Sequence, residues 1–199
     1  MKKKICVVGA GLGGLSAAIR LANKGFEVDL YEQNSTPGGK AGEIKEMGYR
    51  FDTGPSLLTM PQVIKDLFSE CGENIDDYLS INRLELICKY FYPDGSIINA
   101  YSDQDKFGKE IDEKTSDNYA SLDKYLTYCK TIYELAGDLF LTKDPSSVST
   151  YLNSKALKTL LNVGKIDPFR TINEANESFF KDQRLVQLFN RYATYNGSN

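Results

Sequence analysis

Residues 4–32 read KICVVGAGLGGLSAAIRLANKGFEVDLYE, and this stretch combines the signals of a strand, a glycine turn, a helix and a second strand. The apolar run at residues 4–8 predicts a fully buried strand, because such strands lack the polar alternation of exposed ones. Apolar residues at helical spacing over residues 12–24, followed by Gly25, predict a helix with a glycine stop. Residues 27–31 alternate and predict the second strand. The sequence therefore predicts a βαβ unit at its start.

The turn between the first strand and the helix carries the pattern G-x-G-x-x-G at Gly9, Gly11 and Gly14. In such a turn the first glycine permits a tight bend, the second lets backbone approach a pyrophosphate, and the third lets helix and strand pack closely. The free N–H groups at the helix N-terminus then face the phosphates. The pattern predicts a dinucleotide site that also includes the intervening Ala10, Leu12 and Gly13.

An acidic residue follows at the position where a ribose is expected. Glu32 closes the second strand, 18 residues after Gly14, and Gln33 comes next. A carboxylate here can accept hydrogen bonds from both ribose hydroxyls and disfavours a 2′-phosphate. Up to this point the motif fits FAD and NAD equally.

A second glycine-rich region favours FAD. An NAD enzyme would normally continue with more βα units, whereas a flavin enzyme must also seat the ribityl chain and the ring. Glycine backbone at two places would permit that approach, with a lysine near the phosphates. The candidate positions are Gly38, Gly39, Lys40, Gly54, Pro55 and Ser56.

The remaining chain predicts further elements and a division into two parts. The predicted strands cover residues 43–45, 49–52, 86–92 and 97–101, and the predicted helices 61–71, 122–140, 147–161 and 174–192. Pro93-Asp94-Gly95-Ser96 predicts the hairpin turn between the last two strands. The apolar stripe in 122–140 predicts a helix facing its own core. Glu110, Asp112 and Glu113 predict a solvated helix face. We expect an FAD-binding part over residues 1–82 and a partial substrate domain over residues 83–199.

Composition excludes several classes of function. The net charge is −3 and the sequence pI about 5.2, which disfavours nucleic acid as a partner. No histidine is present, so the commonest general base and metal ligand are missing from this sequence. The four cysteines form no C-x-x-C pair, and we expect them to be reduced, buried thiols, with no metal site. No apolar segment is long enough to span a membrane. We therefore expect a bound cofactor to carry out the reaction, and we assign no catalytic side chain in this sequence.

Three segments together resemble a known family. VVGAGLGGL at 7–15, EQNSTPGGK at 32–40 and GYRFDTGPSLLTMP at 48–61 are similar to the start of the bacterial phytoene (carotenoid) desaturases, within the flavin amine oxidase-like group. CKYFYPDG at 88–95 and RYATYNG at 191–197 are also similar to that family. The resemblance covers essentially the whole chain, and within the family it is greatest to the hydroxycarotenoid 3,4-desaturase type.

The resemblance implies an activity and a location. Such proteins use non-covalent FAD to remove hydride from a long, lipophilic isoprenoid, and they act as peripheral proteins at the cytoplasmic membrane face. It implies an α/β fold, with a three-layer FAD/NAD(P)-binding Rossmann-like domain followed by part of a mixed α+β substrate domain. The family positions for FAD match Gly9, Gly11, Gly14, Glu32, Gly39, Lys40 and Gly54. The family often has arginine where Lys40 stands, so a bidentate phosphate contact is weakened here.

Family members are also much longer, which leaves several functions open. A second glycine-and-aspartate motif that they carry is absent from this sequence, so we expect a truncated amino-terminal part that is inactive and poorly stable alone. Alternatives are another flavin amine oxidase-like enzyme (an amine oxidase, polyene isomerase or saturase), an inert dinucleotide-binding fragment, and a pyridine-nucleotide dehydrogenase. The sequence gives no indication of oligomeric state, of the particular carotenoid or of the terminal electron acceptor.

Overall fold

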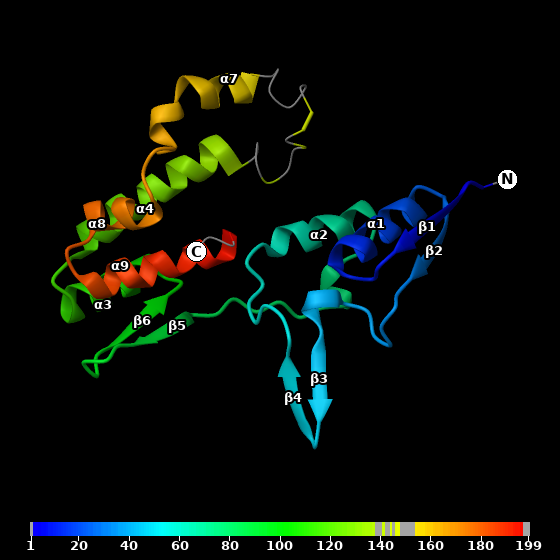
Figure 1. Cartoon of the computed structure of the whole chain (residues 1–199), viewed down its shortest axis with the longest axis horizontal. Coiled ribbons are helices and arrows are strands. Elements are labelled where there is room, and N and C mark those ends of the chain that lie inside the picture. The colour runs from blue at the N-terminus through cyan, green and yellow to red at the C-terminus, as the bar shows by residue number, and fades with distance from the viewer. Residues whose placement is uncertain (1, 138–140, 142–143, 145, 148–153, 197–199) are drawn as a thin grey trace. The chain divides into compact units, whose positions relative to one another are not determined.

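The chain folds into two compact units. A computed structural model describes residues 2–137, 141, 144, 146–147 and 154–196. Unit 1 spans Met1–Arg83 and unit 2 spans Leu84–Asn199. Figure 1 shows unit 1 in blue to teal and unit 2 in green to red. Within the residues so described, no helix is long and apolar enough to cross a membrane.

Unit 1 begins with the predicted βαβ arrangement. Strand β1 (Lys4–Val8) pairs in parallel with β2 (Glu27–Tyr31), and α1 (Leu12–Asn23) connects them. Gly25 has φ of +86°, a conformation that glycine adopts readily, and its N–H bonds to a carbonyl of the last helical turn. The prediction for this stretch is therefore confirmed in element type and order.

The predicted burial of the first strand is wrong. The residues of β1 alternate between exposed and half-buried, Val8 is 83% exposed, and the Cys6 thiol is exposed as well. A parallel strand is fully buried only when it has neighbours on both edges and helices on both faces. Within the described residues β1 pairs only with β2. The apolar side chains of β1 therefore stay partly exposed, because the strand lacks a neighbour on its other edge.

The rest of unit 1 is a short hairpin and a helix. Strands β3 (Glu43–Glu46) and β4 (Tyr49–Asp52) pair antiparallel, and α2 (Pro61–Glu70) follows, as predicted. Two 3-10 turns, η1 (Gly39–Ala41) and η2 (Ile75–Asp77), complete the unit. The guanidinium of Arg20 on α1 donates to the carboxylate of Glu70 on α2 at 2.6 Å, which ties these two helices together.

Unit 2 combines the predicted hairpin with a group of helices. Strands β5 (Leu86–Phe91) and β6 (Ile97–Tyr101) pair antiparallel around Gly95, whose φ is +80°. The helices are α3 (Gln104–Lys114), α4 (Tyr119–Ile132), α7 (Ser154–Leu161), α8 (Ile172–Phe179) and α9 (Gln183–Asn190). Shorter turns are η3 (Tyr133–Gly137, π-helical), η4 (Val163–Lys165) and η5 (Arg191–Asn196).

Three predicted helices differ from those observed. The single helix expected over residues 174–192 is wrong, because α8 ends at Phe179 and α9 starts after the N-cap Asp182, whose carboxylate accepts the Arg184 N–H at 3.0 Å. The helix expected over 122–140 changes to π-helical winding after Ile132, and residues 138–140 lie outside the described residues. Of the helix expected over 147–161, only Ser154–Leu161 is observed, and residues 148–153 also lie outside the described residues.

The hydrophobic core lies mainly in unit 2. Ile98 of β6, Ile111 of α3, Leu122 of α4 and Leu185 of α9 are completely buried and belong to one cluster. Tyr125 of α4 joins them, and Leu126 and Cys129 pack against the cluster. The prediction that this apolar stripe faces a core is therefore confirmed up to Cys129, whereas Tyr133 is 58% exposed. Among the described residues of unit 1, only Ala10 (2% exposed) and Ile75 (6%) are buried apolar side chains.

Glu110 does not lie on a solvated face. It is 8% exposed, and its carboxylate accepts hydrogen bonds from the Asn99 N–H and side-chain amide, both at 2.9 Å, and from Lys114 Nζ at 2.7 Å. A buried carboxylate needs such partners to stay ionised, and they lower its pKa against the opposing effect of burial. The prediction is wrong for Glu110, because charge alone does not reveal its contact with β6, whereas Asp112 and Glu113 are exposed as predicted.

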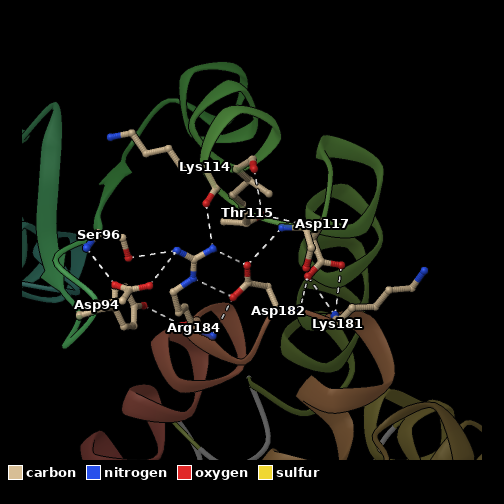
Figure 2. A network of polar contacts seen from close by, with 11 residues as sticks. Asp94, Ser96, Lys114, Thr115, Asp117, Lys181, Asp182 and Arg184 are labelled. Atoms are coloured by element: carbon tan, nitrogen blue, oxygen red, sulfur yellow. Dashed lines mark hydrogen bonds and ion pairs between the residues drawn. The ribbon is translucent and has the colours of Figure 1, made fainter.

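A polar network around Arg184 joins the hairpin of unit 2 to its helices (Figure 2). The guanidinium donates to both carboxylate oxygens of Asp182, at 3.0 and 2.7 Å. It also donates to the Ser96 hydroxyl at 3.0 Å and to the Lys114 carbonyl at 2.9 Å. One side chain thus contacts the β5–β6 turn, the end of α3 and the start of α9.

A second carboxylate extends this network to the segment that precedes α4. Asp117 is buried, and its carboxylate accepts the N–H of Lys181 and, at 2.8 Å, the N–H of Asp182 (Figure 2). These amides belong to the α8–α9 break that the apolar periodicity did not reveal. The break therefore has polar partners for its backbone groups, as buried backbone requires.

We predict an acid-sensitive contribution of Asp182 to stability. The Arg184 guanidinium lowers the pKa of the Asp182 carboxyl to about 2, against roughly 3.9 in an unfolded chain. A depressed folded-state pKa stabilises the protein above the unfolded value, and this is lost as the pH falls from about 4 through 2. The full contribution is about 2–3 kcal/mol for such a shift. Urea unfolding of wild type and Asp182→Asn at pH 7 and pH 3 checks this.

The expected result is a smaller loss of stability on acidification for Asp182→Asn than for wild type. Asp66→Asn, the same charge change at an exposed position of α2, is the matched control and should behave as wild type. Equal acid losses in wild type and Asp182→Asn would contradict the assignment.

Candidate functional site

The β1–α1 turn is built on a close backbone approach. Gly9 has φ of +95°, and its N–H donates to the Tyr31 carbonyl at 2.7 Å, which joins the turn to the end of β2. A Cβ atom placed on Gly14 would lie 1.8 Å from the Gly9 carbonyl oxygen. Only glycine fits at position 14, so the helix starts directly against the end of the strand.

Gly11 is different, because nothing in the protein requires a glycine there. Its φ is −71°, which any residue adopts, and a Cβ atom on it would meet no atom within 4 Å. Gly11 is also the N-cap of α1, and no side chain caps this end of the helix. Open backbone beside uncapped helix N–H groups is the arrangement that phosphate oxygens require.

Glu32 lies beside the same turn. Its carboxylate accepts the Ala10 N–H at 2.7 Å on one oxygen. The other oxygen accepts the N–H and the side-chain amide of Asn34, both at 2.9 Å. The pKa of this carboxyl is below its usual value, first because of the Asn34 N–H and then because of the Ala10 N–H. The half-buried side chain is therefore an ionised acceptor at the edge of the turn.

The second glycine pair packs on the first motif. The Gly38 N–H donates to the Ala10 carbonyl at 2.8 Å, and Gly38 forms a parallel bridge with Gly11. A Cβ atom on Gly39 would lie 3.1 Å from the Gly11 Cα atom, and both Gly38 and Gly39 have positive φ. These two positions need glycine for conformation and for close approach.

The third glycine segment packs on Lys40. A Cβ atom on Gly54 would lie 1.8 Å from the Lys40 carbonyl oxygen, so Gly54 directly contacts the backbone of η1. Lys40 has an exposed side chain, and Pro55 and Ser56 follow in an exposed loop that leads toward α2. Three segments that are separate in sequence thus meet at one place in unit 1.

Most predicted positions therefore lie together, and one contributor was missed. The turn from Gly9 to Gly14, Glu32, the Gly38–Gly39 pair and the Lys40 backbone with Gly54 form a connected set, while Gln33 is exposed next to Glu32. Asn34 was not among the predicted residues. The signal was present, since an asparagine two residues after an acidic side chain can bond back to it.

The described residues offer no cluster of three or more histidine, cysteine, aspartate or glutamate side chains that could hold a metal ion. The polar groups here are instead backbone N–H donors, one carboxylate that accepts hydrogen bonds, and one lysine. Such donors and such an acceptor suit the phosphate and ribose groups of a nucleotide.

These features define the class of protein: the chain carries a Rossmann-like dinucleotide-binding domain. The model of the NAD(P)-binding Rossmann-like domain family matches residues 7–71, which include every segment described above.

More specific relatives are carotenoid enzymes. The chain is 38% identical over 197 residues to a 1-hydroxycarotenoid 3,4-desaturase of Flavobacterium sp. (strain P99-3), covering 99% of this chain and 40% of that protein. It is 35% identical to a 4,4'-diapolycopene oxygenase of Methylomonas sp., and 33% identical to a 4,4'-diaponeurosporene oxygenase of Staphylococcus haemolyticus (strain JCSC1435). These alignments cover 99% and 100% of this chain and 39% of each relative. The resemblance inferred from the sequence is confirmed.

The chain spans about 40% of the length of these curated relatives. Among solved structures, a redesigned putrescine oxidase aligns with a TM-score of 0.48 at 15% identity, over 88% of this chain and 36% of that one.

We predict that two glycines of the turn differ in their effect on stability. Gly14→Ala forces its Cβ into the Gly9 carbonyl and should destabilise unit 1 by about 1–3 kcal/mol, the usual range for overpacking. Gly11→Ala places its Cβ in open space and should change stability by less than about 1 kcal/mol. Urea unfolding followed by circular dichroism measures both. Equal losses for the two variants would contradict the geometry of the turn.

Proposed function

We propose that this chain is the dinucleotide-binding part of an FAD-dependent oxidoreductase that desaturates a carotenoid by hydride transfer to the flavin. The observation that carries the proposal is the packing of Gly38 and Gly39 on the β1–α1 turn beside Gly11, where a Cβ atom would meet no other atom within 4 Å. The carotenoid names of the curated relatives support the substrate class.

Each part of the site has a proposed role. The N-terminus of α1 would bind the pyrophosphate, with Gly11 allowing close approach. Glu32 would accept hydrogen bonds from the adenosine ribose, and Lys40 would add positive charge near the phosphates as a point charge. The proposed FAD-binding residues are Gly9, Ala10, Gly11, Leu12, Gly13, Gly14, Glu32, Gln33, Gly38, Gly39, Lys40, Gly54, Pro55 and Ser56.

When bound, FAD supplies the hydride acceptor. The residues of this chain bind and orient it, and the absence of histidine fits a reaction in which this stretch provides no general base. We propose that residues 1–82 hold the cofactor and that residues 83–199 belong to the substrate domain. The unit boundary at Arg83 and Leu84 supports this division.

A second candidate is oxygenation of a carotenoid end group. Two relatives at 35% and 33% identity are named as oxygenases of diapocarotenoids, and they share the same stretch of sequence with this chain. Both activities require the same nucleotide site, so the site described here supports the two equally. We favour desaturation because the relative at 38% identity is named as a desaturase.

The substrate class suggests a location. Carotenoids are long and lipophilic, so an enzyme that acts on them must take them from a membrane. We propose peripheral association with the cytoplasmic face of a membrane.

The proposal predicts that the purified chain releases FAD when precipitated with acid, identified by chromatography and absorbance. Gly11→Ala should weaken FAD binding by at least about tenfold, because a methyl group would occupy the position that the pyrophosphate approaches. Gly164→Ala, whose Cβ also meets nothing within 4 Å, is the matched control in unit 2. Release of NAD, or unchanged FAD affinity in Gly11→Ala, would contradict the proposal.

A further inference from the structure

The Glu32 carboxylate accepts hydrogen bonds on both of its oxygens. Asn34 donates twice to Oε1, through its backbone N–H and its side-chain Nδ2, each at 2.9 Å. Ala10 donates its N–H to Oε2 at 2.7 Å. An ionised carboxylate offers about four acceptor sites, so these three donors occupy most of its acceptor capacity and fix its orientation.

The two anchors differ in what they connect. The Ala10 N–H belongs to the glycine turn and joins Glu32 to the proposed phosphate site. Asn34 belongs to the exposed segment after β2, and within the residues that the structure describes its hydrogen bonds go to Glu32, so its effect reaches the turn through Glu32. The Asn34 side-chain amide restrains the rotation of the Glu32 carboxylate group. The Asn34 backbone N–H would remain if another residue such as alanine stood at position 34.

We propose that Asn34 is a positioning residue for the adenosine ribose of the dinucleotide, since its side chain holds the Glu32 carboxylate in the orientation that accepts a ribose hydroxyl. The inference rests on the proposed dinucleotide site and adds to it a residue that touches the ribose-binding group.

The test compares ADP with 2′-deoxy-ADP on the full chain by titration calorimetry. Wild type should prefer ADP, since only ADP offers the 2′-hydroxyl to Glu32. Asn34→Ala should bind ADP ~3–10-fold more weakly and bind 2′-deoxy-ADP nearly as wild type does, which is the range for losing one hydrogen bond. Asn34→Ser, which keeps a short donor, should restore most of the preference for ADP.

A double-mutant cycle separates positioning from general structure. In a Glu32→Gln background, Asn34→Ala should have no further effect on ADP affinity, because the group it positions has been replaced. Asn74→Ala is the matched control, since Asn74 caps η2 in the same unit, accepting the Asp76 N–H at 3.2 Å. That variant should bind both nucleotides as wild type does.

Each other outcome overturns the inference. Equal weakening of ADP and 2′-deoxy-ADP in Asn34→Ala would assign the residue a merely structural role. Unchanged binding of both would remove any role for it. If wild type binds neither FAD nor ADP, the proposed dinucleotide site fails and the inference fails with it.

Discussion

The close contact between Gly14 and the Gly9 carbonyl fixes the relation of helix α1 to strand β1. With a Cβ atom at position 14 only 1.8 Å from that oxygen, any other residue would push the helix away from the end of the strand. The turn would then open, and the Gly9 N–H would lose its bond to the Tyr31 carbonyl at the end of β2. This single approach therefore holds the two strands, the helix N-terminus and the open backbone of Gly11 in one arrangement.

The other glycine segments depend on that arrangement. Gly38 and Gly39 pack against Ala10 and Gly11, and this packing is possible only while the turn stays tight. Glu32 reaches the Ala10 N–H for the same reason. The polar groups of the site are thus positioned by backbone contacts, with little help from side-chain packing.

Features that depend on contacts between residues close in sequence could be predicted, and features that depend on contacts between distant residues could not. The βαβ unit, both hairpins and the glycine positions were predictable, because turns and periodicity are local properties. The break between α8 and α9 was missed because Phe180 and Leu185 are both buried and keep the apolar pattern continuous through it, although the N-cap Asp182 was a local signal of a helix start. Its backbone bonds to Asp117, about 64 residues earlier, and no local signal reports such a contact. The prediction of an exposed Glu110 was wrong for the same reason, because its partner Asn99 lies on strand β6 and the contact depends on tertiary structure.

The two units differ in what stabilises them. Unit 2 has a continuous apolar core and a polar network on Arg184 that ties its turn to its helices. Unit 1 has Ala10 and Ile75 as its buried apolar side chains in the described residues, so the proposed nucleotide site lies in a unit with a small fully buried core. A ligand that binds only the folded form stabilises it by RT ln(1 + [L]/Kd), or about 2.7 kcal/mol at a hundredfold excess over Kd. A bound dinucleotide would therefore be a large part of the stability of unit 1, because hydrophobic burial contributes so little there.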